Sequence, residues 1–167
     1  MVAPMAGSGA ARDENNRVIA TNRPARHNFF IEDTFECGIM LQGSEVKSLR
    51  ESKVQITDAF GHLDAGELWL HNLHIAPYSH SQRHTGHDPV RRRKLLLHRR
   101  EIDRIRARMQ HERLSLVPMQ LYFKDGKAKL ELGLGKGKKN VDKRQDIAKR
   151  DAARDTEREM GRSLKTW

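Results

Sequence analysis

Apolar and polar residues alternate in several short segments of this chain, and a period of two residues is typical of half-buried β-strands. The clearest case is LSLVPMQLYFKDGKAKLELGLG, where the alternation runs toward Asp125 and Gly126 and resumes beyond them. Two residues of these types between alternating runs predict a two-residue β-hairpin. The segment 27–43, HNFFIEDTFECGIMLQG, is rich in aromatic and branched residues and predicts one or two strands.

The segment 54–78 continues this pattern, with a turn at Ala65 and Gly66. The phase of the alternation shifts between Leu70 and Leu73, which predicts a bulge or a bend.

Two other segments have helical spacing. In GSEVKSLRES, Ser44 can cap a short helix with Val46 and Leu49 on one face. In HRREIDRIRARMQHE, apolar residues recur every three to four positions and the rest of the surface is basic: the apolar stripe is Ile102, Ile105 and Met109.

Short strands with one small and one larger helix between them predict a mainly β fold. We expect a small antiparallel β-barrel resembling the oligonucleotide-binding (OB) fold, with accessory helices. Residues 1–16 have no periodicity and predict a disordered arm that packs against nothing. The barrel is expected to span 17–135, and the charge-rich segment 136–167 to form a basic C-terminal tail.

Charge indicates the class of partner. The 167 residues carry a formal charge of +10, so a polyanion is the first hypothesis. Residues 1–135 hold 21 Lys and Arg against 16 Asp and Glu, and residues 136–167 hold 11 against 6. The tail therefore has the same net charge as a body four times longer, which favours a segment that lies along phosphates.

Other function classes have weaker support. Cys37 stands alone in a strand-like segment, which predicts a buried structural thiol and a reducing cytoplasm. No export signal and no apolar segment of membrane-spanning length is present, so we expect no membrane partner. We also expect no cofactor, and a monomer.

Two motifs resemble chemical sites without matching them. One is a histidine-rich loop whose spacing would allow a metal site: His80, His84, His87 and Asp88. It lacks the rigid helical frame of typical zinc sites, so no metal is expected. A metal-dependent enzyme built on this loop is kept as a third hypothesis. GLGKGKKN lacks the Walker spacing and is interpreted as a flexible, phosphate-seeking hinge. No catalytic motif with an identifiable base appears, so no catalytic residue is assigned.

Basic residues next to aromatic rings favour RNA binding. NRPARHNFF places Arg23, Arg26 and His27 beside Phe29 and Phe30, a combination of phosphate ligands and stacking rings. Alternation along a strand predicts that at least one of the two phenylalanines belongs to the core. A second basic cluster at 91–94 consists of four consecutive cations, whose repulsion a bound polyanion would relieve.

Three segments together resemble the SsrA-binding protein family, also called small protein B, the protein partner of transfer-messenger RNA (tmRNA). They are NRPARHNFFIEDTFECGIMLQGSEVKSLRESKVQITDAF, HDPVRRRKLLLHRREID and GKGKKNVDKRQDI. The resemblance covers about residues 17–150. It implies an OB-like barrel without catalytic activity, which binds the tRNA-like domain of tmRNA and delivers it to stalled bacterial ribosomes in trans-translation.

The resemblance also implies site residues. The RNA-binding positions are Asn22, Arg23, Arg26, His27, Glu36, Lys94 and Leu95. We expect the three cations to contact phosphates, His27 to stack and Asn22 to meet a base edge or sugar. Glu36 would accept hydrogen bonds from base amino or imino groups or orient a neighbouring Arg. Leu95 would either pack or touch RNA.

For the tail, the resemblance implies a segment that is disordered alone and helical in the messenger channel near the decoding centre, where it mimics the missing codon–anticodon part. The expected tail contacts are Lys136, Lys138, Lys139, Asp142, Lys143, Arg144, Arg150, Arg154, Arg158 and Met160. Arg150, Arg154 and Arg158 recur every four residues, and acids three positions before an Arg would support a helix. The alternative function is a ribosomal protein or a translation-associated binder of single-stranded RNA.

Overall fold

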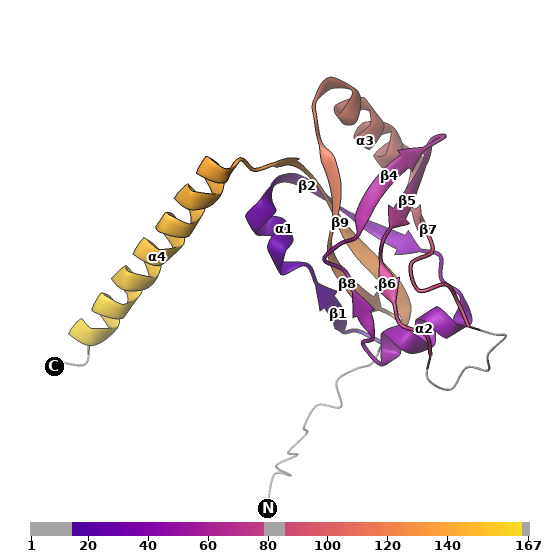
Figure 1. Cartoon of the computed structure of the whole chain (residues 1–167), viewed down its shortest axis with the longest axis horizontal. Coiled ribbons are helices and arrows are strands. Elements are labelled where there is room, and N and C mark those ends of the chain that lie inside the picture. The colour runs from indigo at the N-terminus through magenta and orange to yellow at the C-terminus, as the bar shows by residue number, and fades with distance from the viewer. Residues whose placement is uncertain (1–14, 79–85, 165–167) are drawn as a thin grey trace, which may run out of the picture.

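The computed structural model describes residues 15–78 and 86–164. Nine strands and four helices follow one another in these residues (Figure 1). In chain order they are β1 (Val18–Thr21), α1 (Arg23–Asn28), β2 (Phe29–Ile39), α2 (Gly43–Arg50), β3 (Val54–Gln55), β4 (Phe60–Asp64), β5 (Glu67–His71), β6 (His74–Ile75), β7 (Arg93–Leu96), α3 (Arg99–His111), β8 (Ser115–Lys124), β9 (Lys127–Gly137) and α4 (Asn140–Ser163).

Six of the strands close into a ring. Antiparallel pairings run in the order β8-β4-β5-β7-β2-β9, and β9 pairs again with β8, while β1 adds to the outer edge of β8. β3 and β6 form a separate two-stranded pair. The mainly β, antiparallel fold is confirmed, and the closed ring is compatible with an OB-like barrel.

Both predicted turns are present. Asp125 and Gly126 have φ of 51° and 77° and join β8 to β9, with Lys124 opposite Lys127. Ala65 and Gly66 have φ of 48° and 77° and join β4 to β5 in the same way. Two successive left-handed residues give the tight turn whose twist matches the flanking strands.

The bend after β5 is centred on Asn72. This residue has a φ of 59°, and it separates β5 from β6. Asparagine tolerates the left-handed region better than most residues do, which explains why the chain turns there. The predicted break between Leu70 and Leu73 is confirmed, because both side chains are buried although they are three positions apart, an odd number that would put them on opposite faces of one regular strand.

The core fills the barrel with branched and aromatic side chains. Leu68, Leu121 and Leu130 are fully buried in it, and α3 contributes Ile105 from outside the ring. Cys37 belongs to the same core, and burial raises the pKa of its thiol to about 12. Such a thiol is protonated at neutral pH, so Cys37 has the predicted structural role.

Helix α2 begins differently from the prediction. Gln42 is its N-cap, and the backbone N–H of Gln42 donates to the Glu45 carboxylate at 2.9 Å, closing a capping box. Ser44 lies inside the first turn, where its hydroxyl is 2.9 Å from Nδ1 of His87. The predicted cap at Ser44 is therefore wrong, because Glu45 at the third helical position favours an earlier start.

The predicted glycine hinge is also wrong, because β9 continues through Gly137. A Cβ at Gly135 would lie 2.2 Å from the carbonyl oxygen of Phe30, next to the bulge between Ile31 and Asp33 in β2. Glycine at 135 therefore allows two strands to approach closely, and Lys136 belongs to the barrel.

The end of the N-terminal arm contacts the barrel. The Gly126 N–H donates to the Asn15 carbonyl, and the Asp125 N–H donates to Oδ1 of Asn16, each at 3.0 Å. These two residues thus hold the β8–β9 turn, contrary to the expectation that the arm packs against nothing. Residues 1–14 lie outside the described part.

Candidate nucleic-acid interface

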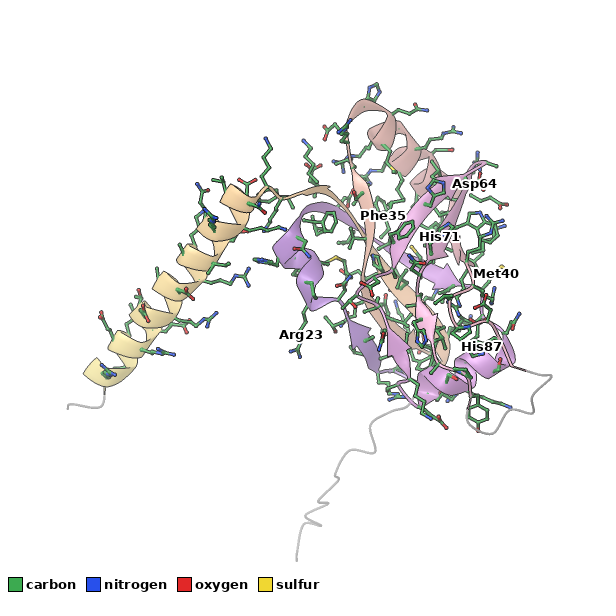
Figure 2. The ribbon with its side chains drawn as sticks, in the orientation of Figure 1. Arg23, Phe35, Met40, Asp64, His71 and His87 are labelled. Carbon is green, nitrogen blue, oxygen red and sulfur yellow. The ribbon has the colours of Figure 1, made fainter. Side chains whose placement is uncertain are left out.

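Helix α1 presents the first basic group. Pro24 occupies its first turn, and Ala25 is buried against Val117 and Met119, which fixes the helix on the barrel. Arg23 and Arg26 are exposed, and Figure 2 shows Arg23 pointing away from the barrel. The sequence suggested no helix here, because six residues beside a strand carry little periodicity.

Asn22 does not point outward with its neighbours. It is 3% exposed, its backbone N–H donates to the Met119 carbonyl at 2.8 Å, and its side-chain Nδ2 donates to the Pro118 carbonyl at 2.9 Å. Its amide nitrogen is hydrogen-bonded to β8, while its Oδ1 has no hydrogen-bond partner among the described residues. Asn22 therefore positions the start of α1, and its contact with RNA stays a prediction.

Lys138 connects α1 to α4. Its side chain is 8% exposed; its ammonium donates to the Arg26 carbonyl at 3.1 Å and pairs with Asp146 of α4. The same ammonium lies 4.7 Å from the centre of the Phe30 ring. Lys138 was expected to contact the ribosome, but its side chain is occupied inside the protein.

The basic α1 group and the tail also meet directly. Arg150 Nη2 lies 3.4 Å from Nδ1 of His27. The hydrogen bond from Lys138 lowers the pKa of Asp146, so that carboxylate stays ionised and holds its partner at neutral pH. The structure therefore links Arg26 and His27 to the N-terminal half of α4.

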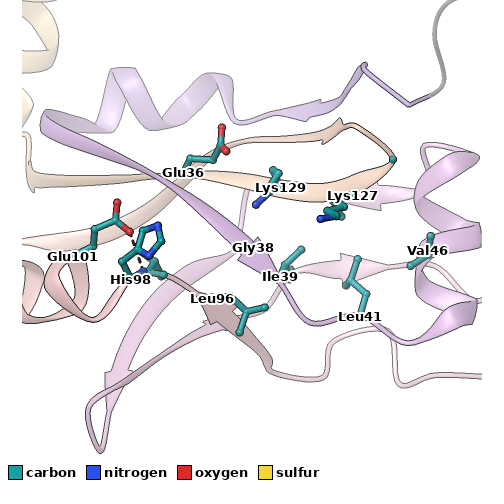
Figure 3. Close-up of a pocket in the computed structure, with 13 residues that line it drawn as sticks. Glu36, Gly38, Ile39, Leu41, Val46, Leu96, His98, Glu101, Lys127 and Lys129 are labelled. Carbon is teal, nitrogen blue, oxygen red and sulfur yellow. Dashed lines mark hydrogen bonds between the residues drawn. The ribbon is translucent and has the colours of Figure 1, made fainter.

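Glu36 lies on β2, away from α1, and borders a groove of about 820 Å³ (Figure 3). Its carboxylate accepts a hydrogen bond from the Tyr122 hydroxyl at 2.6 Å and contacts Lys124 at 3.4 Å. The hydrogen bond from Tyr122 and the cation lower the pKa of Glu36. Desolvation and this carboxylate raise the pKa of Tyr122, which remains a donor. Glu36 is therefore a charged acceptor at neutral pH.

The floor of the groove is formed where β2 pairs with β7. Gly38 lies opposite Leu96, and a Cβ at Gly38 would come within 3.2 Å of the Leu96 side chain. Lys127 and Lys129 rise from β9 on one side (Figure 3). The groove combines apolar walls with an acid and two cations, which suits a base with its phosphate.

Lys94 and Leu95 point in opposite directions. Lys94 is partly exposed and pairs with Glu67 at 2.9 Å, whereas Leu95 is 1% exposed in the core. Burial of Leu95 favours the packing role, one of the two roles expected for it. Leu96, 49% exposed and lining the groove, was missed by sequence reasoning, although alternation in RKLLL places Lys94 and Leu96 on the same face.

The basic cluster at 91–94 is neutralised from within. Glu45, which is fully buried, pairs with both Arg91 and Arg93. Arg93 is itself 0% exposed and donates to the Leu73 carbonyl at 2.6 Å. Burial acts to raise the pKa of Glu45, but hydrogen bonds from Gln42, Arg91 and Arg93 outweigh it and lower that pKa.

Arg92 and Lys94 have partners as well, since Arg92 pairs with Asp64 at 3.6 Å and Lys94 with Glu67. The expectation that a polyanion relieves repulsion within the cluster is therefore wrong, because carboxylates of the protein already do so.

Helix α4 carries the predicted tail residues from Asp142 to Met160, and it leads away from the barrel (Figure 1). Lys139 is its N-cap, and the Lys139 N–H donates to the Asp142 carboxylate at 3.2 Å. Asp151 and Arg154 lie 4.0 Å apart and Asp155 and Arg158 lie 3.9 Å apart, which confirms two of the predicted i, i+3 pairs.

The remaining tail residues are placed as follows. Lys136 lies in β9 and pairs with Glu112 at 3.2 Å, so it belongs to the barrel surface. Met160 is 63% exposed, and no residue of α4 whose burial is described is buried. Lys143 and Arg144 lie in the first turns of the helix, half-buried and exposed respectively.

The cluster from His80 to Asp88, where no metal is expected, is only partly described. His80 and His84 lie outside the described residues. His87 is buried, with its two ring nitrogens each 2.9 Å from a partner, the Ser44 hydroxyl and the Ile75 carbonyl. His87 thus fastens α2 to β6 and has no nitrogen left for a metal.

Comparison with known proteins gives one consistent result. The family model described as SmpB protein matches residues 19–162. An SsrA-binding protein of Mycobacterium sp. (strain KMS) is 54% identical over 166 residues, covering 99% of this chain and 98% of its own length. One of Corynebacterium efficiens is 54% identical over 153 residues, covering 92% and 93%.

A solved structure is also similar. A chain described under "tmRNA-SmpB: a journey to the center of the bacterial ribosome" matches with a TM-score of 0.61 and 44% identity, covering 77% of this chain and 93% of its own. Among the described residues, no helix is long and apolar enough to cross a membrane. On these matches, the chain belongs to the SmpB protein family, in which its relatives are SsrA-binding proteins.

Proposed function

We propose that this protein is a non-enzymatic, monomeric cytoplasmic adaptor that binds tmRNA, also called SsrA RNA, and delivers it to stalled ribosomes for trans-translation. The observation that carries this proposal is the family match, which extends from the barrel through almost all of α4. Relatives at 54% identity are SsrA-binding proteins, and the similar solved structure concerns tmRNA and SmpB in the bacterial ribosome. Body and tail thus resemble one functional unit.

The α1 group supplies the proposed phosphate contacts. Arg23 and Arg26 are exposed, and no carboxylate of the described residues lies within ion-pair distance of either one. Guanidinium groups on a short helix can each contact a phosphate, while the His27 ring offers a stacking surface. Their affinity for RNA should therefore depend strongly on salt.

The groove beside Glu36 supplies the proposed base contact. Its carboxylate has about four lone-pair sites, of which Tyr122 and Lys124 occupy part. The remaining sites can accept from a base amino or imino group, and Lys129 stands nearby for the phosphate. An ionised acceptor held by a tyrosine explains how an acid can lie on an RNA-binding surface.

The tail is proposed to be the ribosome-sensing element, which becomes helical in the messenger channel and stands in for the missing codon–anticodon part. Arg150, Arg154 and Arg158 supply a basic stripe along α4. A helix without a buried side chain gains little from tertiary packing, and exposed i, i+3 pairs contribute a few tenths of a kcal/mol each. We therefore expect the free tail to be largely disordered beyond Arg150, which still contacts His27 of α1.

A truncation separates the two roles. The stop should follow Lys139, because Gly137 still pairs with Phe29 and the Lys138 N–H donates to the Asn28 carbonyl at 2.8 Å. The truncated protein should bind the tRNA-like domain of tmRNA with nearly full affinity and fail to support tagging on stalled ribosomes. Tagging by the truncated protein would contradict the proposed role of the tail.

A competition assay tests the alternative, a translation-associated binder of single-stranded RNA. A labelled tRNA-like domain should be displaced by the same unlabelled domain at much lower concentration than by an unstructured RNA of equal length. Equal competition would favour the alternative. The variant Arg23→Ala should weaken binding of the tRNA-like domain. It should also reduce the slope of log affinity against log salt concentration by about one, the value for one phosphate contact.

A further inference from the structure

The outer face of β4, β5 and β7 carries a group of rings that none of the roles above uses. Along β5, Leu68 and Leu70 are buried in the core, so the residues between and beyond them face outward. We call this surface the aromatic face, and its members are Phe60, His62, Trp69, His71 and Arg92.

The rings are arranged by strand register. Phe60 lies opposite His71 and His62 lies opposite Trp69 in the β4–β5 pairing. The Phe60 and His71 rings stack, with centroids 5.3 Å apart and planes 9° from parallel, and His62 meets the edge of His71 at 5.7 Å and 79°. Phe60 is nevertheless 45% exposed, so much of this large ring meets solvent.

Trp69 extends the face toward β7. The Arg92 guanidinium carbon lies 4.3 Å from the centre of the Trp69 ring, and Lys94 is its cross-strand partner. A guanidinium over an indole forms a flat cationic layer that can also cover a base. The arrangement thus spans three neighbouring strands.

The cations of this face are paired. Arg92 lies 3.6 Å from Asp64 and Lys94 lies 2.9 Å from Glu67. Because each positive charge is matched, the face is unsuited to following a chain of phosphates. Its chemistry instead favours the flat, weakly polar faces of bases, while the +10 charge of the whole chain attracts the RNA.

Most of the aromatic face lies apart from the proposed phosphate contacts, although Phe60 borders a pocket of about 420 Å³ that Pro24 and Asn28 of α1 also line. Figure 1 shows β4, β5 and β7 on the side of the barrel opposite to α4, and Figure 2 shows His71 and Asp64 on the far side of the barrel from Arg23. The Nε2 atom of His71 is buried and has no hydrogen-bond partner among the described residues.

We propose that the aromatic face is a second RNA-binding surface, which stacks unpaired bases of a single-stranded segment. This surface is additional to the proposed RNA contacts of α1 and of the groove beside Glu36. Its binding of bases does not depend on which RNA those two sites hold. Sheets that present aromatic residues at alternate positions bind bases in this way, with little dependence on sequence.

Intrinsic fluorescence tests this surface directly. The chain has two tryptophans, Trp69 and Trp167, so the full-length Trp167→Phe variant reports from Trp69 alone. Hexauridylate should quench this fluorescence to saturation, and raising salt from about 50 to 200 mM should weaken binding less than about tenfold, because few phosphates are contacted. A 12-base-pair RNA duplex, whose bases are already stacked, should not produce the same quenching.

Two variants and a control complete the test. Phe60→Leu and His71→Leu should each weaken hexauridylate binding about 5- to 100-fold. The control is Val18→Ala, which shortens a side chain that is 54% exposed on β1. It should change hexauridylate affinity less than about twofold. Circular dichroism should show all three variants folded. The proposal would be overturned by absent or unsaturable quenching, or by equal quenching with the duplex. Unchanged hexauridylate binding by both ring variants would also overturn it, and would point to a protein partner for this face.

Discussion

Replacing Glu45 with alanine should destabilise the barrel strongly, because Glu45 holds two cations in place. Its carboxylate is fully buried, and its partner Arg93 is 0% exposed. After the change, Arg93 keeps its hydrogen bonds to the Leu73 and Pro89 carbonyls but remains a buried cation without the carboxylate on its Nε.

The expected loss can be estimated from the burial. Removing one partner of a buried ion pair typically costs about 3–5 kcal/mol, because the other charge cannot regain its hydration. A domain of this size is stable by about 5–15 kcal/mol in total. With about 3 °C per kcal/mol for a domain of this length, the melting temperature should fall by about 10–15 °C.

Thermal unfolding followed by circular dichroism measures this effect. Glu67→Ala is the matched control, since it breaks the pair with Lys94, whose side chain is 35% exposed. An exposed pair contributes about 0–1 kcal/mol, so the control should lower the melting temperature by less than about 3 °C. If the melting temperature of Glu45→Ala falls by no more than that of the control, the structural role of this network is refuted.

Three further predictions concern the coupling, the RNA site and acid stability. Lys138→Ala should raise the picosecond-to-nanosecond mobility of α4 in backbone 15N relaxation, because it removes the link from Arg26 to Asp146; unchanged relaxation would contradict the link. Glu36→Arg should weaken binding of the tRNA-like domain at least about tenfold although it adds positive charge, since a charged acceptor is worth about 1.5–3 kcal/mol; tighter specific binding would show that the role is misjudged. Because the pKa of Glu45 is lowered on folding, the folded protein binds fewer protons than the unfolded chain. Its stability should therefore fall as pH drops below about 4.5, and Glu45→Gln should show a shallower fall in acid denaturation; equal slopes would be the contrary result.

Local patterns predicted those parts of the fold that depend on neighbouring residues. The pair Asp125-Gly126 specifies a hairpin by its own backbone preferences, and the spacing from Ile102 to Met109 specifies the stripe of α3. The buried role of Cys37 followed from its strand context. Each of these features is set within a few residues of sequence, so one chain suffices to find it.

Features that depend on partners distant in the sequence could not be predicted from local patterns. The cluster at 91–94 resembled a phosphate site because nothing nearby shows that Glu45, 46 residues before Arg91, would be buried against it. Gly135 resembled a hinge because its close neighbour is the Phe30 carbonyl, on another strand. The burial of Asn22, and the choice of packing for Leu95, depend on strands distant in the sequence.

The most direct test of the central claim is the identity of the RNA that the protein carries. Full-length protein should be purified from its bacterial lysate under mild salt, and the bound RNA sequenced, with Arg23→Ala in parallel. We predict strong enrichment of one structured RNA with a tRNA-like end, reduced in the variant. Recovery of bulk messenger RNA without that species, or no RNA at all, would contradict tmRNA binding.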